Sequence, residues 1–116
     1  MLKTYAQMQK DKLRTMNERV RDLSRLQQQE LERLTLLQQH SDSIHPPQNA
    51  SSVLFYQNAV AMKASVEQVI EVQTQRVVNT AHDLHQQQDA AAKQRAYYLA
   101  LNTLLEKRKP AKSRED

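Results

Sequence analysis

The chain has 116 residues, with sixteen Gln and no Gly, Cys or Trp, and its 17 Lys and Arg against 13 Asp and Glu give a net charge of +4. The absence of glycine excludes phosphate-cradling loops, dinucleotide-binding turns and nucleophile elbows, because each needs a residue that tolerates positive φ or a close backbone approach. The absence of cysteine excludes disulfide frameworks, zinc knuckles and thiol nucleophiles.

The remaining composition favours helices. Hydrophobic residues make up 39% of the chain and aromatic residues 4%, which is too little large apolar surface for a spherical core, whereas good helix formers dominate. The longest uncharged stretch, residues 43–62, contains His, Pro, Gln and Asn and is not expected to span a membrane. The N-terminus lacks the apolar run of a signal peptide. We therefore expect an all-α, soluble and unprocessed chain without a transmembrane segment.

Proline divides the chain into two helical segments. Pro46 and Pro47 cannot continue a helix, and Asn49, Ser51 and Ser52 are candidate N-caps for the helix that follows. The next proline lies near the C-terminus, so nothing interrupts the second segment. The expected organisation is a first long helix, a Pro-containing turn, a second long helix and a disordered basic tail, over residues 1–42, 43–52, 53–109 and 110–116.

The first helix has a heptad pattern with an interruption. Four apolar residues follow 3-4-3 spacing, namely Leu13, Met16, Val20 and Leu23. The later leucines, Leu31, Leu34 and Leu37, continue this face only if the register slips near Gln27–Gln29, which predicts a stutter. The glutamine clusters at 27–29 and 86–88 could hydrogen-bond across the seam or be solvated, and the pattern favours solvation.

The second helix also fits a heptad template when Tyr56 is taken as an a position. Seven of the eight a positions are apolar or aromatic, but only three of the seven d positions are apolar. This pattern predicts a supercoiled but thin seam. The a positions are Tyr56, Lys63, Ile70, Val77, Leu84, Ala91, Tyr98 and Leu105; the d positions are Ala59, Val66, Gln73, Thr80, Gln87, Gln94 and Leu101.

Two long amphipathic helices joined by a short connection pack as neighbours. We therefore expect an elongated antiparallel two-helix coiled-coil hairpin. If Asp42 lies opposite Ser52, then Met1 lies near Lys93. Residues 94–109 would then project beyond the N-terminus without an intrachain partner.

This expected overhang is apolar and cationic. Its apolar stripe comprises Tyr97, Tyr98, Leu101, Leu104 and Leu105, with Leu99 at the edge. Burying each such side chain is worth about 1.5–3 kcal/mol, so a contiguous exposed stripe indicates a binding partner. Residues 93–116 carry seven basic and three acidic side chains, which would steer this end toward an acidic surface.

Several of these features together resemble the FliJ family, the stalk proteins of the flagellar type III export apparatus. They are the two helices with a Pro-containing break, the Phe55-Tyr56-Gln57 start of the second helix, its Gln-rich middle and the ending LNTLLEKRK. The YscO-like stalk proteins of injectisomes are similar in the same respects. The resemblance covers nearly the whole chain.

The resemblance implies a cytoplasmic adaptor, peripherally associated with the inner membrane, whose open end enters the hexameric export ATPase. The other end would face the cytoplasmic ring of the export gate, and recycling of export chaperones would be a further role. The gate contact would involve Tyr56 and Gln57, although Ala59 departs from the larger hydrophobe usual in the family. The expected ATPase contacts are Tyr97, Tyr98, Leu101, Leu104, Leu105, Glu106, Lys107 and Arg108.

The residues also bear on three other functional interpretations. A homodimeric coiled-coil scaffold is the main alternative, because a second copy could cover the apolar stripe. Nucleic-acid binding is disfavoured, since the basic residues of the first helix alternate with acidic ones. His82 and His85 are expected on solvated helix surface, because a metal site needs more converging ligands. No catalytic residue, cofactor or metal site is expected, and the chain is not expected to be an enzyme.

Overall fold

The computed structural model describes residues 2–45 and 53–108. Within these ranges the chain forms two helices, α1 (Leu2–Ser43) and α2 (Val53–Arg108), and no strand. The all-α fold predicted from composition is confirmed. Pro46, Pro47, the candidate N-caps Asn49, Ser51 and Ser52, and the predicted tail at 110–116 lie outside the described residues.

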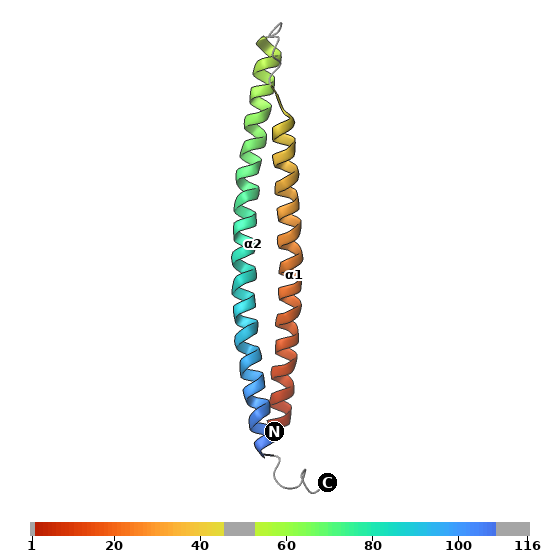
Figure 1. The fold of residues 1–116 in the computed structure, drawn as a ribbon, viewed down its shortest axis with the longest axis vertical. Helices are drawn as coiled ribbons and strands as arrows, with labels where there is room; N and C mark the ends of the chain where they lie inside the picture. The colour runs from red at the N-terminus through yellow and green to blue at the C-terminus, as the bar shows by residue number, and fades with distance from the viewer. Residues whose placement is uncertain (1, 46–52, 109–116) are drawn as a thin grey trace. The chain divides into compact units, whose positions relative to one another are not determined.

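The chain divides into two compact units. We call the first the terminal unit, which comprises Met1–Ser24 and Asp83–Asp116, and the second the central unit, which comprises Arg25–His82. In each unit a segment of α1 lies beside a segment of α2 and runs in the opposite direction (Figure 1). The predicted antiparallel two-helix hairpin is therefore confirmed.

The seam of α2 follows the predicted heptads. Every a and d position from Ala59 to Leu105 is buried or half-buried, whereas the first residues of the helix, 53–58, are exposed. Polar residues occupy several of these positions, including Gln73, Thr80, Gln87 and Gln94. A 3.5-residue repeat therefore determines which face of α2 is covered, even where the side chains are not apolar.

The seam of α1 keeps an uninterrupted 4-3 spacing. Buried or half-buried positions continue through Leu23, Gln27, Glu30, Leu34 and Leu37 without a slip. The predicted stutter is therefore wrong, and Leu31 is 40% exposed rather than part of the seam. The interpretation that the glutamine clusters are solvated is also wrong for two of their members. Gln27 accepts a hydrogen bond from Thr80, and Gln87 is half-buried at a seam position.

Side-chain hydrogen bonds explain how the central unit accommodates polar seam residues. The Nε2 of Gln73 donates to the backbone oxygen of Glu30 at 2.9 Å and also to the Glu30 carboxylate. The Thr80 hydroxyl donates to Oε1 of Gln27. Glu30 and Gln73 are only 6% and 4% exposed. Because these groups are satisfied across the seam, the heptad register can continue through them without the desolvation penalty of an unpaired polar group.

The core of each unit is a narrow line of side chains. Among the described residues, the hydrophobic side chains classed as buried are Ala6, Ala91 and Leu101, each 7% exposed. No large side chain there is completely enclosed. With so few buried apolar atoms, the stability gained per residue is small, and the polar contacts across the seam carry more weight than in a globular core.

Candidate functional site

The start of α1 packs against the C-terminal half of α2 in the terminal unit. The hydroxyls of Tyr5 and Tyr97 share a hydrogen bond at 2.6 Å, and their rings meet edge-to-face with centroids 6.4 Å apart. Gln9 lies four residues after Tyr5 on α1, and its Oε1 accepts a hydrogen bond of 2.7 Å from Nε2 of Gln94. Leu101 is buried in the same unit. These contacts align residues 5–9 with residues 94–97.

This alignment corrects the predicted overhang. Met1 was expected near Lys93, and residues 94–109 were expected to lack an intrachain partner. Instead, Gln94, Tyr97 and Leu101 are already covered or bonded by their own chain. The prediction assumed that the two helices are paired symmetrically about the turn. The register is instead set by side-chain contacts along the seam. In the central unit, residues 53–58 of α2 are exposed and extend past the end of α1 (Figure 1).

The predicted apolar stripe is consequently divided between the seam and its two flanks. Leu101 is buried and the other two seam members, Tyr98 and Leu105, are half-buried. On one flank Tyr97 and Leu104 remain 46% and 57% exposed. Leu99 lies on the other flank and is 53% exposed.

The charged end of the predicted ATPase contact is exposed. Glu106 and Lys107 both lie in the last turns of α2 with their side chains in solvent. The side chain of Arg108 lies outside the described part of the chain. The surface of α2 that a partner could contact at this end is therefore narrow. It consists of the exposed flank with Tyr97 and Leu104, followed by the oppositely charged Glu106 and Lys107.

The contact between Tyr5 and Tyr97 affects the protonation of one of the two phenols. The hydrogen bond with Tyr5 raises the pKa of Tyr97 above its ordinary value of 10.0, and desolvation acts in the same direction. Donation from the Tyr97 hydroxyl to the Tyr5 oxygen stabilises the protonated phenol. The contact therefore favours the neutral form of Tyr97.

The predicted gate residues lie at the start of α2. Tyr56 is 46% exposed and Gln57 is exposed. They belong to an apolar segment in which Val53 and Leu54 are each 66% exposed. The segment is accessible from solvent, but it precedes the seam, and residues 46–52 next to it lie outside the described ranges.

Comparison with known proteins gives no match: no family model, no curated protein and no solved structure is similar to this chain. The interpretation of its surfaces therefore depends on its own residues and geometry.

Cationic side chains border an open depression on the terminal unit. Two adjoining open hollows of about 410 and 420 Å³ share Asn17 as a common wall. Ala91, Ala96 and Leu99 of α2 line the first hollow, and Leu13 of α1 lines the second. We call these two hollows together the basic groove, because cationic side chains border both of them.

Four cations border the basic groove, namely Lys10, Arg14, Arg21 and Arg95. The groove also has one acidic neighbour, Glu18. None of the four cations forms an ion pair with another described residue; the ion pairs found among residues 2–45 and 53–108 are Arg33 with Glu30 and His85 with Asp89. Their charge is therefore available to a partner.

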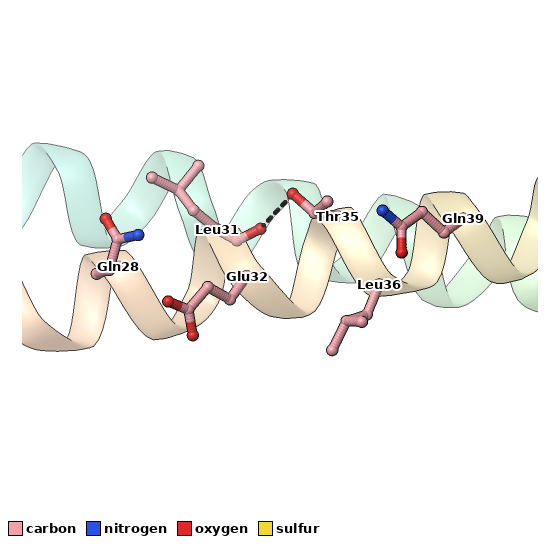
Figure 2. Close-up of a pocket in the computed structure, with 6 residues that line it drawn as sticks. All are labelled: Gln28, Leu31, Glu32, Thr35, Leu36 and Gln39. Atoms are coloured by element: carbon pink, nitrogen blue, oxygen red, sulfur yellow. Dashed lines mark hydrogen bonds between the residues drawn. The ribbon is translucent and has the colours of Figure 1, made fainter.

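A further hollow lies on the outer face of α1 in the central unit (Figure 2). All six residues that line it come from this one helix: Gln28, Leu31, Glu32, Thr35, Leu36 and Gln39. The Thr35 hydroxyl donates to the backbone oxygen of Leu31 at 3.0 Å, which is a local helix contact (Figure 2). A depression formed by one helix cannot enclose a small ligand from several sides, as binding pockets do.

His85 forms a local contact on the exposed surface of α2. Nε2 of His85 lies 3.4 Å from Oδ2 of Asp89, one turn further along α2, and both side chains are exposed. Within the described ranges, no three His, Cys, Asp or Glu side chains converge as metal ligands would. Neither described helix has an apolar stretch long enough to cross a bilayer.

Sequence reasoning missed the basic groove and the Tyr5–Tyr97 contact. The cations at positions 10, 14 and 21 recur at helical spacing along one side of α1, and this signal was available. The alanines of α2 that form the groove floor gave no comparable signal, because alanine is equally common on solvated helices. The tyrosine contact required the register, which the heptads alone do not determine.

Proposed function

We propose that this chain is a non-catalytic coiled-coil adaptor of a type III protein export apparatus, in which the C-terminal end of α2 contacts the hexameric export ATPase. The export gate and the export chaperones are its further partners in this proposal. The two-helix antiparallel fold, the exposed Tyr97 and Leu104 flank and the resemblance of the chain to FliJ and YscO-like proteins support it.

The observation that carries the proposal is the composition of this exposed end. Tyr97 and Leu104 present apolar surface on one flank, and Glu106 and Lys107 follow within the last turns of the helix. Aromatic and leucine anchors next to charged residues are the usual way in which a helix docks into a partner. The seam residues Tyr98, Leu101 and Leu105 hold this end in place rather than contact the partner directly.

The test is stimulation of the export ATPase, followed as phosphate release in the presence of the full chain. The variant Leu104→Gln with Lys107→Glu changes only exposed positions, so it keeps its helical circular dichroism and loses stimulation. The matched control, Leu36→Gln with Arg25→Glu, makes the same changes at exposed positions of the central unit and keeps stimulation. Undiminished stimulation by the first variant contradicts the ATPase contact.

The competing function is a homodimeric scaffold. The exposed valines and methionine of α2 in the central unit, among them Val60, Met62 and Val69, favour self-association. Sedimentation at micromolar concentration separates the two functions, because an adaptor that enters an ATPase ring is monomeric and a scaffold is dimeric.

A further inference from the structure

We propose that the basic groove of the terminal unit is a docking site for an acidic amphipathic helix of another protein. The inference does not rest on the export role, because it follows from the shape and charge of one surface. The groove shares only Tyr98 with the residues assigned above to the ATPase contact.

The shape of the groove suits a helix. It lies between the α1 and α2 segments of the terminal unit, and seam residues such as Leu13, Val20 and Ala91 border it. A third helix that packs on a two-helix coiled coil occupies this position and contacts the same residues. Ala92 and Ala96 have small side chains, so another helix can approach α2 closely at this point.

The apolar part of the groove favours a ligand that buries apolar surface over a purely electrostatic one. Leu99 is 53% exposed at its edge, and Ala91 and Ala96 contribute no polar atom beyond the backbone. Nucleic acids bind through phosphates, which gain nothing from this surface. A helix with a leucine or alanine stripe buries it.

The positive charge of the groove determines that the partner is negatively charged. Lys10, Arg14, Arg21 and Arg95 have no ion pair among the described residues, and Glu18 is the one acid that lines the two hollows. A cationic partner would meet like charge on both sides. Glu or Asp residues flanking the apolar stripe of an incoming helix complement the rim, which accelerates encounter and selects the partner.

A second copy of this chain does not supply such a helix. The acidic residues of α1 alternate with basic neighbours, as Asp11 does with Lys10 and Lys12. In α2, Glu67 and Glu71 form one acidic pair, and the next acids along the helix are more than a turn away. No face of either helix carries four acids around an apolar stripe, so the occupant is a different protein.

The experiment measures binding of labelled designed peptides to the full chain by fluorescence anisotropy. The probe is an amphipathic helix of about four heptads, with apolar a and d positions and Glu at e and g. A matched peptide with Lys in place of Glu, and polyglutamate of equal length, serve as ligand controls. We expect the acidic helix to bind, and the Lys peptide and polyglutamate to bind at least about tenfold more weakly at about 0.1 M salt.

Two pairs of variants locate the binding surface. Reversing three groove cations, with Arg14→Glu, Arg21→Glu and Arg95→Glu, weakens binding of the acidic helix by about tenfold or more. The control reverses three exposed cations of the same unit that do not line the groove, Lys12, Arg19 and Lys93, and leaves the affinity within about a factor of three. The apolar contribution is tested in the same way, since Leu99→Gln weakens binding and Leu36→Gln does not.

Four results would overturn the inference. They are equal losses in the two charge-reversal variants, equal binding of polyglutamate, displacement of the acidic helix by duplex DNA at equal charge concentration, and loss of the binding site through dimerisation of the chain. The assay contains no ATPase, so its failure is distinguishable from failure of the proposed export function.

Discussion

The two units of this hairpin share one heptad pattern but differ in what their seams and surfaces contain. The terminal unit has 13 basic and 8 acidic residues, a net charge of +5, whereas the central unit has 4 and 5, a net charge of −1. The terminal seam includes Leu101, Ala6 and Ala91. The central seam is joined by Glu30 with Gln73 and by Gln27 with Thr80.

The difference between the two seams shows two tasks that seam residues of a coiled coil can perform. In the central unit, buried polar partners specify the register, because a shift of either helix would leave a carboxylate or an amide without its partner. In the terminal unit, apolar seam residues, the tyrosine contact and the hydrogen bond from Gln94 to Gln9 hold the helices, while the flanks carry unpaired charge. This division of tasks between the two units predicts effects of graded size on the stability of the chain.

The largest effect is expected for Leu101→Ala. Leu101 is buried against the start of α1, so its truncation removes apolar contacts and lowers the free energy of unfolding by about 3 kcal/mol. Leu104→Ala, at an exposed position of the same turn, changes it by less than about 0.5 kcal/mol. Urea unfolding followed by circular dichroism measures both. Equal effects of the two substitutions would show that this end of α2 is not packed on α1.

The polar pair of the central unit is expected to give the next effect. Gln73→Leu leaves the buried Glu30 without its cross-helix donor and lowers the free energy of unfolding by about 2 kcal/mol. The double variant Glu30→Leu with Gln73→Leu recovers most of this loss, because no buried carboxylate remains without its cross-helix donor. A double-mutant cycle by urea unfolding measures the coupling, and additive effects would mean that the two side chains do not interact.

A gain in stability is expected at Gln87 in the terminal unit. Its Oε1 is buried and has no hydrogen-bond partner among the described residues. Gln87→Leu removes this buried oxygen and raises the free energy of unfolding by about 1 kcal/mol. Gln86→Leu, at the exposed neighbouring position, gives no comparable gain in the same thermal or urea titration. A loss on substitution of Gln87 would indicate that its amide does have a partner.

The smallest effect is the pH dependence of the tyrosine contact. Because the folded-state pKa of Tyr97 is raised, its contribution to stability is complete below the ordinary value of 10.0 and is lost as the pH rises through the folded-state pKa. Tyr5→Phe removes the hydrogen bond and lowers the pKa of Tyr97 toward its ordinary value. Tyrosinate absorbance during alkaline titration measures the shift, and Tyr56→Phe is the control. An unchanged Tyr97 titration in Tyr5→Phe would contradict the contact.

Much of the fold could be predicted from local pattern. Helix-forming composition and Pro46-Pro47 indicated two helices, and the heptads counted from Tyr56 identified the covered face of α2 from Ala59 onward. The stutter near Gln27 was wrongly inferred because Leu31 looked like a better seam residue than Glu30. A pattern of apolar residues cannot show that a polar side chain will find a partner on the opposite helix.

The candidate sites were less predictable than the fold. The apolar stripe from Tyr97 to Leu105 was recognised, but its division into seam and flanks depends on where α1 begins relative to α2. The basic groove needed Arg14 and Arg21 to be placed beside Ala91 and Leu99 of the other helix. These residues are far apart in sequence, and neither group is conspicuous alone.

The sequence by itself determined that this chain forms two helices and which stripe of α2 each heptad turns toward its partner, because both follow from local propensity and a seven-residue period. Only the tertiary structure decided how far one helix is displaced along the other. A heptad repeat looks nearly the same after each shift of seven residues. The choice among these registers therefore falls to the few side chains, Gln9 with Gln94, Glu30 with Gln73 and Tyr5 with Tyr97, whose hydrogen bonds form in one alignment.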